Sequence, residues 1–292
     1  MPARGVEPAL RLGAHMSIAG GMPESVVRAR AVEATALQVF VKSSNQWAAR
    51  PFADGEAAAF RRAAEEAGLA RHVIAHASYL VNLASPDDAL WERSVAALGE
   101  ELSRCGALGI VSLVVHPGAH MGAGEEAGLR RVTAALDRVL ALGNGEGPSV
   151  LLEITAGQGS CLGATFEQLA WVLERARRGE RLGVCFDTCH ALAAGYEFRD
   201  ARSYRETMGR LDETVGLERV QALHLNDSKN GIGSRKDRHA HIGEGEVGLE
   251  AFRLLLNDPR FRGVPMVLET PKGDDLEEDR VNLRVLRGLV GR

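Results

Sequence analysis

The sequence predicts an α/β fold, a single (β/α)8 TIM barrel with its active site at the C-terminal ends of the strands. Three observations predict this fold. Eight short apolar runs alternate with eight amphipathic helical patterns along the 292 residues. The runs are apolar on both faces, which is typical of buried parallel strands. Each run ends in or next to a polar residue, usually of a type that binds metal ions or phosphate.

The eight strands are expected at residues 10–15, 37–42, 73–76, 111–116, 150–153, 184–187, 222–225 and 266–269. The polar residues at their ends are His15, Lys42, His76, His116, Glu153, Asp187, His224 and Glu269. Because parallel strands of a barrel all end at the same face, these side chains should gather there.

The eight helices are expected at residues 23–34, 56–68, 86–109, 125–142, 165–178, 203–216, 249–261 and 275–290. In the third pattern, Ser85 is expected to cap the helix and Pro86 to lie in its first turn. Most links that follow strands are long and irregular, and the longest covers residues 227–248. No linker or repeat divides the sequence, so we expect one domain over residues 1–292.

The composition is that of an ordinary globular protein, with 45% hydrophobic and 25% charged residues. A net charge of −4 gives no basic surface for nucleic acid, although three divalent ions would add six positive charges in one cleft. Four cysteines are too few for a disulfide framework. We find no membrane span or signal peptide in the sequence, so we expect a cytoplasmic protein.

Three carboxylates, Glu153, Asp187 and Glu269, each complete a buried apolar strand. A charge in that position is costly unless it is paired or bound to metal. Their convergence with histidines at other strand ends favours metal binding over isolated ion pairs. Histidine and carboxylate ligands suit Zn²⁺ or Mn²⁺. The nearby Cys185 and Cys189 are interpreted as buried core residues.

A separate candidate site follows the sixth strand. His190 comes three residues after Asp187, in the loop expected there. Asp237 and His239 are two residues apart, so in extended backbone their side chains point the same way. Together, His190, Asp237 and His239 could supply three ligands and leave a metal coordination position open. The remaining loop histidines, His120 and His241, and the strand-end His15 are candidates for contacts to ligands or phosphate.

Two neighbouring loops carry large side chains, with Trp47 in one and Tyr79 and Leu80 in the other. These residues either anchor the loops against the barrel rim or form a stacking and wedge surface for nucleobases. The glycine-rich stretches 155–160 and 227–234 match neither the Walker A nor the dinucleotide-binding pattern.

Eight motifs in order resemble the endonuclease IV family of apurinic/apyrimidinic (AP) endonucleases. They are GAHMSIAGG (13–21), HASYLVNLAS (76–85), VVHPGAH (114–120), LEITAGQGSCLG (152–163), CFDTCHALAAGYE (185–197), HLNDSKN (224–230), SRKDRHAHIGEG (234–245) and LETP (268–271). The resemblance covers nearly the whole chain. It implies a zinc-dependent hydrolase of base excision DNA repair that cuts double-stranded DNA 5′ to abasic sites. The products would be a 3′-hydroxyl and a 5′-deoxyribose phosphate, and a monomer is expected.

The resemblance also implies the ligands of three zinc ions, with Mn²⁺ as an alternative at one site. The first ion would be held by His76, His116 and Glu153, the second by Glu153, Asp187, His224 and Glu269, and the third by His190, Asp237 and His239. Glu153 would bridge two ions and Glu269 would orient the attacking hydroxide, so both are predicted catalytic residues. Contacts to DNA are implied for Gln46, Trp47, Tyr79, Leu80 and Asn82. Asn45 stands where the family often has an arginine that enters the duplex.

Two alternatives remain at this stage. A sugar isomerase or epimerase with one or two divalent ions would explain the strand-end ligands but does not need the site of His190, Asp237 and His239. A non-catalytic binder of damaged DNA with structural zinc would normally have closed sites rich in thiolates.

Overall fold

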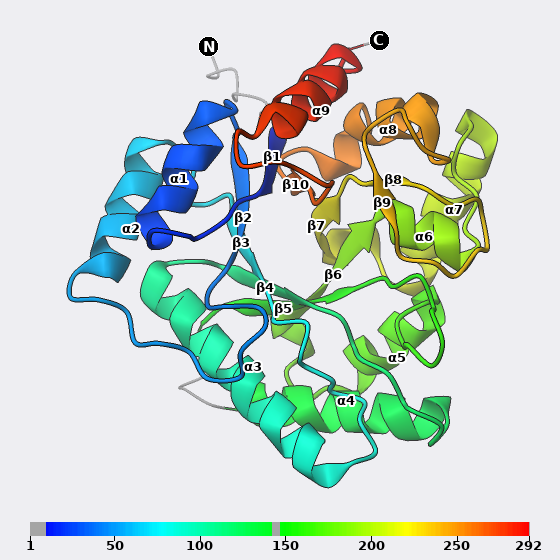
Figure 1. Ribbon diagram of the computed structural model, residues 1–292. Coiled ribbons are helices and arrows are strands. Elements are labelled where there is room, and N and C mark those ends of the chain that lie inside the picture. Colours follow the sequence, from blue (N-terminus) through cyan, green and yellow to red (C-terminus); the bar gives the residue numbers. More distant parts are fainter. Residues whose placement is uncertain (1–9, 142–146, 292) are drawn as a thin grey trace, which may run out of the picture.

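The computed structural model describes residues 10–141 and 147–291. Eight parallel strands close into a barrel in the order β1-β10-β7-β6-β5-β4-β3-β2. Figure 1 shows these strands at the centre of the molecule and the helices on the outside. The predicted fold class is therefore confirmed.

All eight expected strands are present. Their bounds are β1 Arg11–His15, β2 Ala36–Phe40, β3 Val73–His76, β4 Ser112–Val115, β5 Ser149–Glu153, β6 Leu182–Asp187, β7 Val220–His224 and β10 Pro265–Leu268. The largest disagreement at a carboxyl end is in β2, because Lys42 lies two residues beyond the end of this strand.

The expected helices are present as well, and most are shorter than their patterns. Their bounds are α1 Met22–Ala31, α2 Glu56–Glu66, α3 Asp88–Leu108, α4 Glu125–Leu140, α5 Phe166–Arg175, α7 Ala201–Thr214, α8 Gly248–Leu256 and α9 Glu277–Gly288. The pattern expected at 249–261 divides into α8 and the short 3₁₀ helix η3 Pro259–Phe261, because a proline cannot continue a helix. Residue 142, the last of the fourth expected pattern, lies outside the described residues.

The prediction that Ser85 caps α3 and that Pro86 lies in its first turn is wrong, because both residues precede the helix. Asp87 is the N-cap, and its carboxylate accepts a hydrogen bond from the Leu90 amide. The Ser85 hydroxyl instead accepts a hydrogen bond from the main-chain amide of Asp87, the N-cap residue itself. Aspartate is favoured at this position because its charge complements the exposed amides of the first turn.

Besides the 3₁₀ helices η1 Gly179–Arg181 and η2 Leu217–Arg219, a short helix and a small sheet were not predicted. The short helix α6, Thr188–Ala194, directly follows β6, and a small antiparallel sheet joins β8, Asp227–Ser228, to β9, His239–Ala240. Both are too short for hydrophobic periodicity to show in the sequence. The Asp187 carboxylate caps α6 by accepting from the His190 amide, and Gly195 ends the helix at a φ of 110°.

The barrel interior is built in layers. One apolar layer consists of Ala36, Ile74, Val114, Leu151, Cys185, Ala222 and Val267. Side chains two residues apart on a strand point to the same face, so a second layer of inward-pointing side chains lies two residues further along the strands, toward their carboxyl ends. This second layer is polar. It consists of Gln38, His76, His116, Glu153, Asp187, His224 and Glu269, and His15 completes it from β1. At Gly13 of β1, a Cβ atom would lie 1.8 Å from the Ala36 carbonyl oxygen, so only glycine allows this approach of β1 to β2.

The opposite faces of the strands pack against the surrounding helices and form the main hydrophobic core. Among the described residues, no helix combines the length and apolar character needed to cross a membrane.

Candidate metal centre

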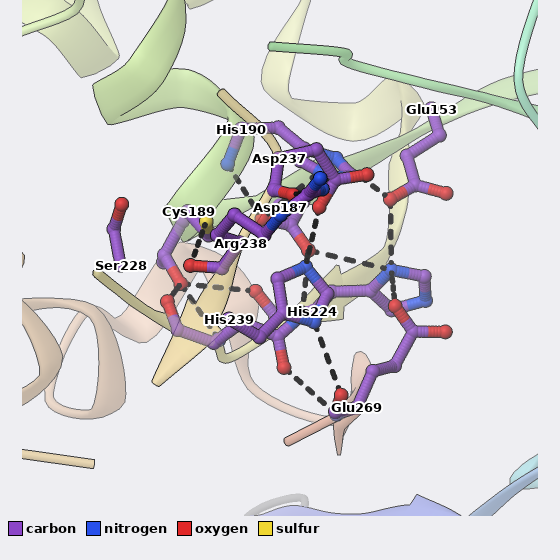
Figure 2. A network of polar contacts seen from close by, with 12 residues as sticks. Glu153, Asp187, Cys189, His190, His224, Ser228, Asp237, Arg238, His239 and Glu269 are labelled. Atoms are coloured by element: carbon purple, nitrogen blue, oxygen red, sulfur yellow. Dashed lines mark hydrogen bonds and ion pairs between the residues drawn. The ribbon is translucent and has the colours of Figure 1, made fainter. Parts of the chain in front are cut away.

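Histidine and carboxylate side chains at the carboxyl ends of the strands converge into three groups. Within each group, the candidate ligand atoms all lie within 4.8 Å of one another. The groups are His76, His116 and Glu153; Glu153, Asp187, His224 and Glu269; and Asp187, His190 and His239. Figure 2 shows several of these side chains turned toward one another from different strands and loops.

Glu153 connects the first two groups. Its Oε2 atom lies 3.0 Å from His76 Nε2 and 3.1 Å from His116 Nε2. Its Oε1 atom lies 3.0 Å from His224 Nδ1. The carboxylate is fully buried, and its two oxygens face different sets of nitrogen atoms. This geometry is suited to a carboxylate that bridges two ions.

Two further carboxylates face the same nitrogen of His224. Glu269 Oε2 lies 3.3 Å and Asp187 Oδ2 lies 3.7 Å from His224 Nδ1. The main chain of Glu269 and the carboxylate of Asp187 are connected through Asn226. This buried side chain donates to Asp187 Oδ2 at 2.6 Å and accepts from the Glu269 amide at 2.7 Å.

The third group is formed around α6 and β9, which the sequence did not predict. His190 lies on α6, so its placement in a loop was wrong, and His239 lies on β9. Asp237 Oδ1 is 3.2 Å from His190 Nε2 and 3.3 Å from His239 Nε2. Asp187 Oδ2 is also 3.9 Å from His239 Nε2. The three residues singled out in the sequence are therefore together, with Asp187 beside them.

Main-chain contacts orient three of the histidines. The Nδ1 atoms of His76, His190 and His239 lie 2.8, 3.0 and 3.0 Å from the carbonyl oxygens of Ala77, Ile154 and Glu269. When Nδ1–H donates to a carbonyl, the other ring nitrogen keeps its lone pair for a metal. The buried Nε2 atoms of His190 and His239 face the Asp237 carboxylate at 3.2 and 3.3 Å but are not aligned for a hydrogen bond, as expected of nitrogen atoms that share a cation with it.

The electrostatics of these side chains also favour a bound cation. Burial raises the pKa of Glu153, but His224 and His116 outweigh it and hold that pKa well below the usual range. Burial lowers the pKa of His190, but Asp187, Asp237 and Glu153 outweigh it and raise that pKa well above the usual range. The carboxylates are thus stabilised as anions by protonated histidines. A divalent ion can replace these protons.

The centre opens on one side. The side chains of His116 and Asp237 are 34% and 44% exposed, whereas Glu153 is inaccessible to solvent. A cavity of about 540 Å³ adjoins it, with His116, Asp237, Tyr79 and Asn82 in its lining. A ligand could therefore approach from the loops that follow β3 and β4.

Gln38 is a site residue that the sequence reasoning missed. It belongs to the polar layer on β2, is fully buried, and contacts His224, Glu269 and His15. A polar residue within an otherwise apolar run was the signal, but only the end of that run was taken into account. The partners of Gln38 lie far away in the sequence, so they could not be inferred locally.

Lys42, the strand-end residue predicted for β2, does not reach the polar layer. Its Nζ atom donates to the carbonyl oxygens of Gln46 and Trp47 at 2.7 and 2.8 Å, and lies 3.3 Å from Glu101 Oε1. Both charged groups are buried. The expectation that Lys42 gathers with the other strand-end side chains is wrong. β2 ends two residues earlier than expected, which leaves Lys42 to hold the following loop.

The residues with predicted DNA contacts lie on the loops after β2 and β3. Tyr79 is 65% exposed, Gln46 is exposed and Leu80 is half-buried. Trp47 is half-buried, with the Arg93 guanidinium 4.4 Å from the centre of its ring. The Asn82 amide is engaged by the main-chain N–H and carbonyl of residue 119. Their contacts with DNA stay predictions.

The other residues noted in the sequence have mainly structural partners. The ring of His120 accepts from the Gly124 amide, and the ring of His241 lies 3.2 Å from the Asn282 amide nitrogen. Cys185 and Cys189 are buried, as predicted, and burial raises the pKa of the Cys185 thiol to about 12. A thiol with that pKa is a poor source of thiolate ligand.

Similarity to known proteins agrees with this geometry. A family model described as xylose isomerase-like TIM barrel matches residues 26–288. The chain is 54% identical to a probable endonuclease 4 of Chloroflexus aurantiacus over 280 residues, which covers 96% of this chain and 98% of the relative. Its structure is similar to that of endonuclease IV from Thermus thermophilus, with a TM-score of 0.85, 43% identity, and coverage of 96% and 98% of the two chains.

The barrel is also shared with sugar-modifying enzymes. A D-tagatose 3-epimerase-like protein has a TM-score of 0.69 over 96% of this chain and 98% of its own, but only 17% identity. At that identity the likeness is one of fold alone.

Proposed function

The chain belongs to the endonuclease IV family of AP endonucleases, and on that premise we propose that it cleaves double-stranded DNA on the 5′ side of abasic sites with three bound zinc ions. It is a deoxyribonuclease IV-type enzyme of DNA repair. The proposed products are a 3′-hydroxyl and a 5′-deoxyribose phosphate. A monomer in the cytoplasm stays a prediction of the sequence.

The observation that carries the proposal is the position of Glu153 between two ligand groups, with a third group beside them. The first ion would be held by His76, His116 and Glu153, the second by Glu153, Asp187, His224 and Glu269, and the third by His190, Asp237 and His239. Neighbouring zinc ions lower the pKa of water and neutralise the charge that develops on phosphate and leaving oxygens.

The chain's own groups would position the reactants. Glu269 Oε2 faces the interior of the centre, where a carboxylate can accept a proton from water and orient its lone pair toward phosphorus. The exposed sides of His116 and Asp237 leave room for a phosphate at the mouth of the centre. Gln46, Trp47, Tyr79, Leu80 and Asn82 are proposed to line the path of the DNA.

Selectivity for abasic sites would come from the cost of extruding a nucleotide. A nucleotide without its base loses little stacking when it leaves the duplex. The exposed ring of Tyr79 and the neighbouring Leu80 could then occupy the vacated space. Asn45 is short and uncharged, so it cannot replace a long arginine in that role.

The alternatives from the sequence are less well supported. A sugar isomerase or epimerase needs one or two ions, which leaves the group of His190, Asp237 and His239 without a purpose. A structural-zinc protein would be expected to use thiolates. In the described part of the chain, the three ligand groups contain only histidine, aspartate and glutamate.

Metal analysis combined with a cleavage assay tests the proposal. Protein purified without added metal should contain about three metal ions per chain, mainly zinc. It should cut an abasic duplex, leave an end that a polymerase extends, lose activity in chelator and regain it with Zn²⁺. Undamaged duplex of the same sequence is the control. One ion or none per chain, or cleavage that chelator does not affect, would overturn the proposal.

A further inference from the structure

Gln38 is the one member of the polar layer that is neither a proposed ligand nor titratable. It lies in the middle of β2 and is fully buried. A buried amide is costly unless its polar atoms find partners. All three side-chain partners of Gln38 lie at the metal centre. The centre, and not the packing of β2, therefore explains why a buried polar residue stands at this position.

The amide contacts three side chains. Its Oε1 atom lies 2.8 Å from His224 Nε2. Its Nε2 atom donates to Glu269 Oε1 at 2.5 Å and lies 2.9 Å from His15 Nδ1. The reverse orientation of the amide would place Oε1 against the Glu269 carboxylate, so the network itself determines which end is which.

This orientation selects which nitrogen of His224 is available to a metal ion. Because Gln38 presents an acceptor to Nε2, that nitrogen keeps its proton, and Nδ1 is the nitrogen whose lone pair a metal ion would use. Nδ1 is the atom that faces Glu153 Oε1 at 3.0 Å and Glu269 Oε2 at 3.3 Å. The same amide also restrains the other carboxylate oxygen of Glu269.

His224 differs in this respect from three of the other four ligand histidines. His76, His190 and His239 are oriented by main-chain carbonyls, which no side-chain substitution can remove. The orientation of His224 depends on a side chain. One substitution at position 38 can therefore affect a single ligand group and leave the others intact.

We propose that Gln38 is a positioning residue that selects the metal-binding tautomer of His224 and the orientation of Glu269, and so sets the affinity of the second ligand group for its ion. This inference rests on the proposed metal centre. Hydrogen-bond partners of metal ligands typically change metal affinity by about 10–100-fold when they are removed. We expect a loss of that size, confined to one ion.

The test uses Gln38→Met, which has nearly the same volume but cannot form the three hydrogen bonds. Gln38→Leu is a second variant in case the first does not fold. Val39→Ala is the matched control, because Val39 is the next residue of β2, is buried, and packs in the core outside the barrel. Each full-length protein is dialysed against graded chelator, its metal content is measured, and its cobalt-substituted form is examined by visible absorption.

Gln38→Met should release one ion at about a tenth to a hundredth of the free chelator concentration that wild type requires, and retain the others. The visible spectrum of its cobalt-substituted form should change, because His224 would contribute differently to the ligand field of the bound ion. Val39→Ala should keep the wild-type release profile and spectrum even if it melts at a lower temperature. Wild-type release and spectrum in Gln38→Met, or equal losses in Val39→Ala, would overturn the inference.

The same measurements separate this inference from the proposed function. If wild type holds no metal or does not cleave abasic DNA, the proposed function fails. If wild type does both and Gln38→Met binds metal as wild type does, only the role of Gln38 fails.

Discussion

At the scale of single residues, the centre depends on carboxylates that are too buried to be charged alone. Burial raises the pKa of Glu269, as it does that of Glu153, but His224 and His15, whose Nδ1 atom lies 3.6 Å from Glu269 Oε1, outweigh burial and hold the pKa well below its usual range. A charged carboxylate is what a metal ligand requires. Its charge and its shape can be tested separately, because glutamine has almost the same shape as glutamate.

Glu269→Gln should nearly abolish cleavage and leave binding to abasic duplex largely intact. The amide keeps the volume but loses the charge that would hold the second ion and orient water. Single-turnover rates and binding affinities measured on the same abasic duplex check this. Turnover above about a tenth of wild type would mean a loss below about 1.4 kcal/mol in transition-state stabilisation, and the assignment of Glu269 would be wrong.

Tyr79→Ala should weaken binding to abasic duplex by about 1–3 kcal/mol, the usual scale of a lost stacking contact. The ring is 65% exposed and lies edge-on to Phe40, so it is available to a ligand. Binding to undamaged duplex should hardly change, because that duplex has no gap to fill.

Asn45→Ala is the comparison for Tyr79→Ala, since Asn45 is exposed on the neighbouring loop. Its effect should be smaller. All affinities must be measured at one salt concentration, because phosphate contacts depend strongly on salt. Equal losses on damaged and undamaged duplex would make Tyr79 a general contact, and a larger loss at Asn45 would reverse the assignment.

At the scale of elements, a buried ion pair joins the two loops that follow β2 and β3. Lys42 holds the carbonyls of Gln46 and Trp47, and its partner Glu101 on α3 accepts from the Ser78 amide at 3.0 Å. Ser78 in turn donates from its hydroxyl to the main-chain carbonyl of residue 44 at 2.6 Å. Both loops with predicted DNA contacts are therefore attached to one helix through one ion pair.

Lys42→Met should destabilise the protein by about 3–5 kcal/mol, because it leaves a buried carboxylate without its partner. Burial already raises the pKa of Glu101, with Lys42 acting against it, so the variant should take up a proton there. Affinity for abasic duplex should fall while metal content stays at the wild-type level. Urea unfolding, metal analysis and binding measurements check the three parts.

The double variant Lys42→Met with Glu101→Gln is the control for Lys42→Met. It removes the unpaired charge but keeps the size of both side chains, so it should recover part of the lost stability. If the losses in unfolding free energy of Lys42→Met and of Glu101→Gln alone add up to the loss in the double variant, the two side chains are not coupled. The proposed link between the two loops would then be wrong.

At the scale of the whole molecule, the metal centre connects distant parts of the chain across one end of the barrel. The candidate ligands come from β3, β5, β6 and β7, from α6 and β9, from the loop just before β9, and from residues just beyond β4 and β10. An ion bound there would stabilise the folded state only, since the unfolded chain does not hold these groups together.

Metal removal should lower the melting temperature, and the difference should widen as pH rises. Despite burial, neighbouring carboxylates raise the pKa values of His76 and His190, while Glu153 and Glu269 have lowered pKa values. The histidine contribution is present below the ordinary histidine pKa and is lost as pH rises through the raised values. The carboxylate contribution is present above the ordinary carboxyl pKa and is lost as pH falls through the lowered values.

The metal-free protein should therefore be most stable between these two ranges and weaken above the raised histidine pKa values. Metal binding requires neutral histidines. The metal-bound protein therefore becomes more stable in the pH range in which the protein without metal becomes less stable. Melting curves of chelated and metal-loaded protein across neutral to alkaline pH measure the difference. A gap that stays constant or narrows with rising pH would contradict this account.

Local patterns in the sequence determined the barrel and most of the metal centre. Apolar runs mark strands because buried parallel strands must be apolar on both faces. The strands end at one face, so residues such as Glu153, Asp187 and Glu269 could be predicted to meet before any contact was known. Both inferences use only the direction of side chains along one strand, which neighbouring residues decide.

Only the tertiary structure decided which polar side chains contact each other. Lys42 was misplaced because the end of β2 depends on its pairing with β1 and β3. Gln38 was missed because its partners lie far from it in the sequence. The partners of Gln38 are 186 and 231 residues away in the chain, at His224 and Glu269. The helix that carries His190 is only seven residues long and depends on its Asp187 cap and surrounding contacts. Such contacts form when the barrel closes, so their free energy depends on residues that no local pattern brings together.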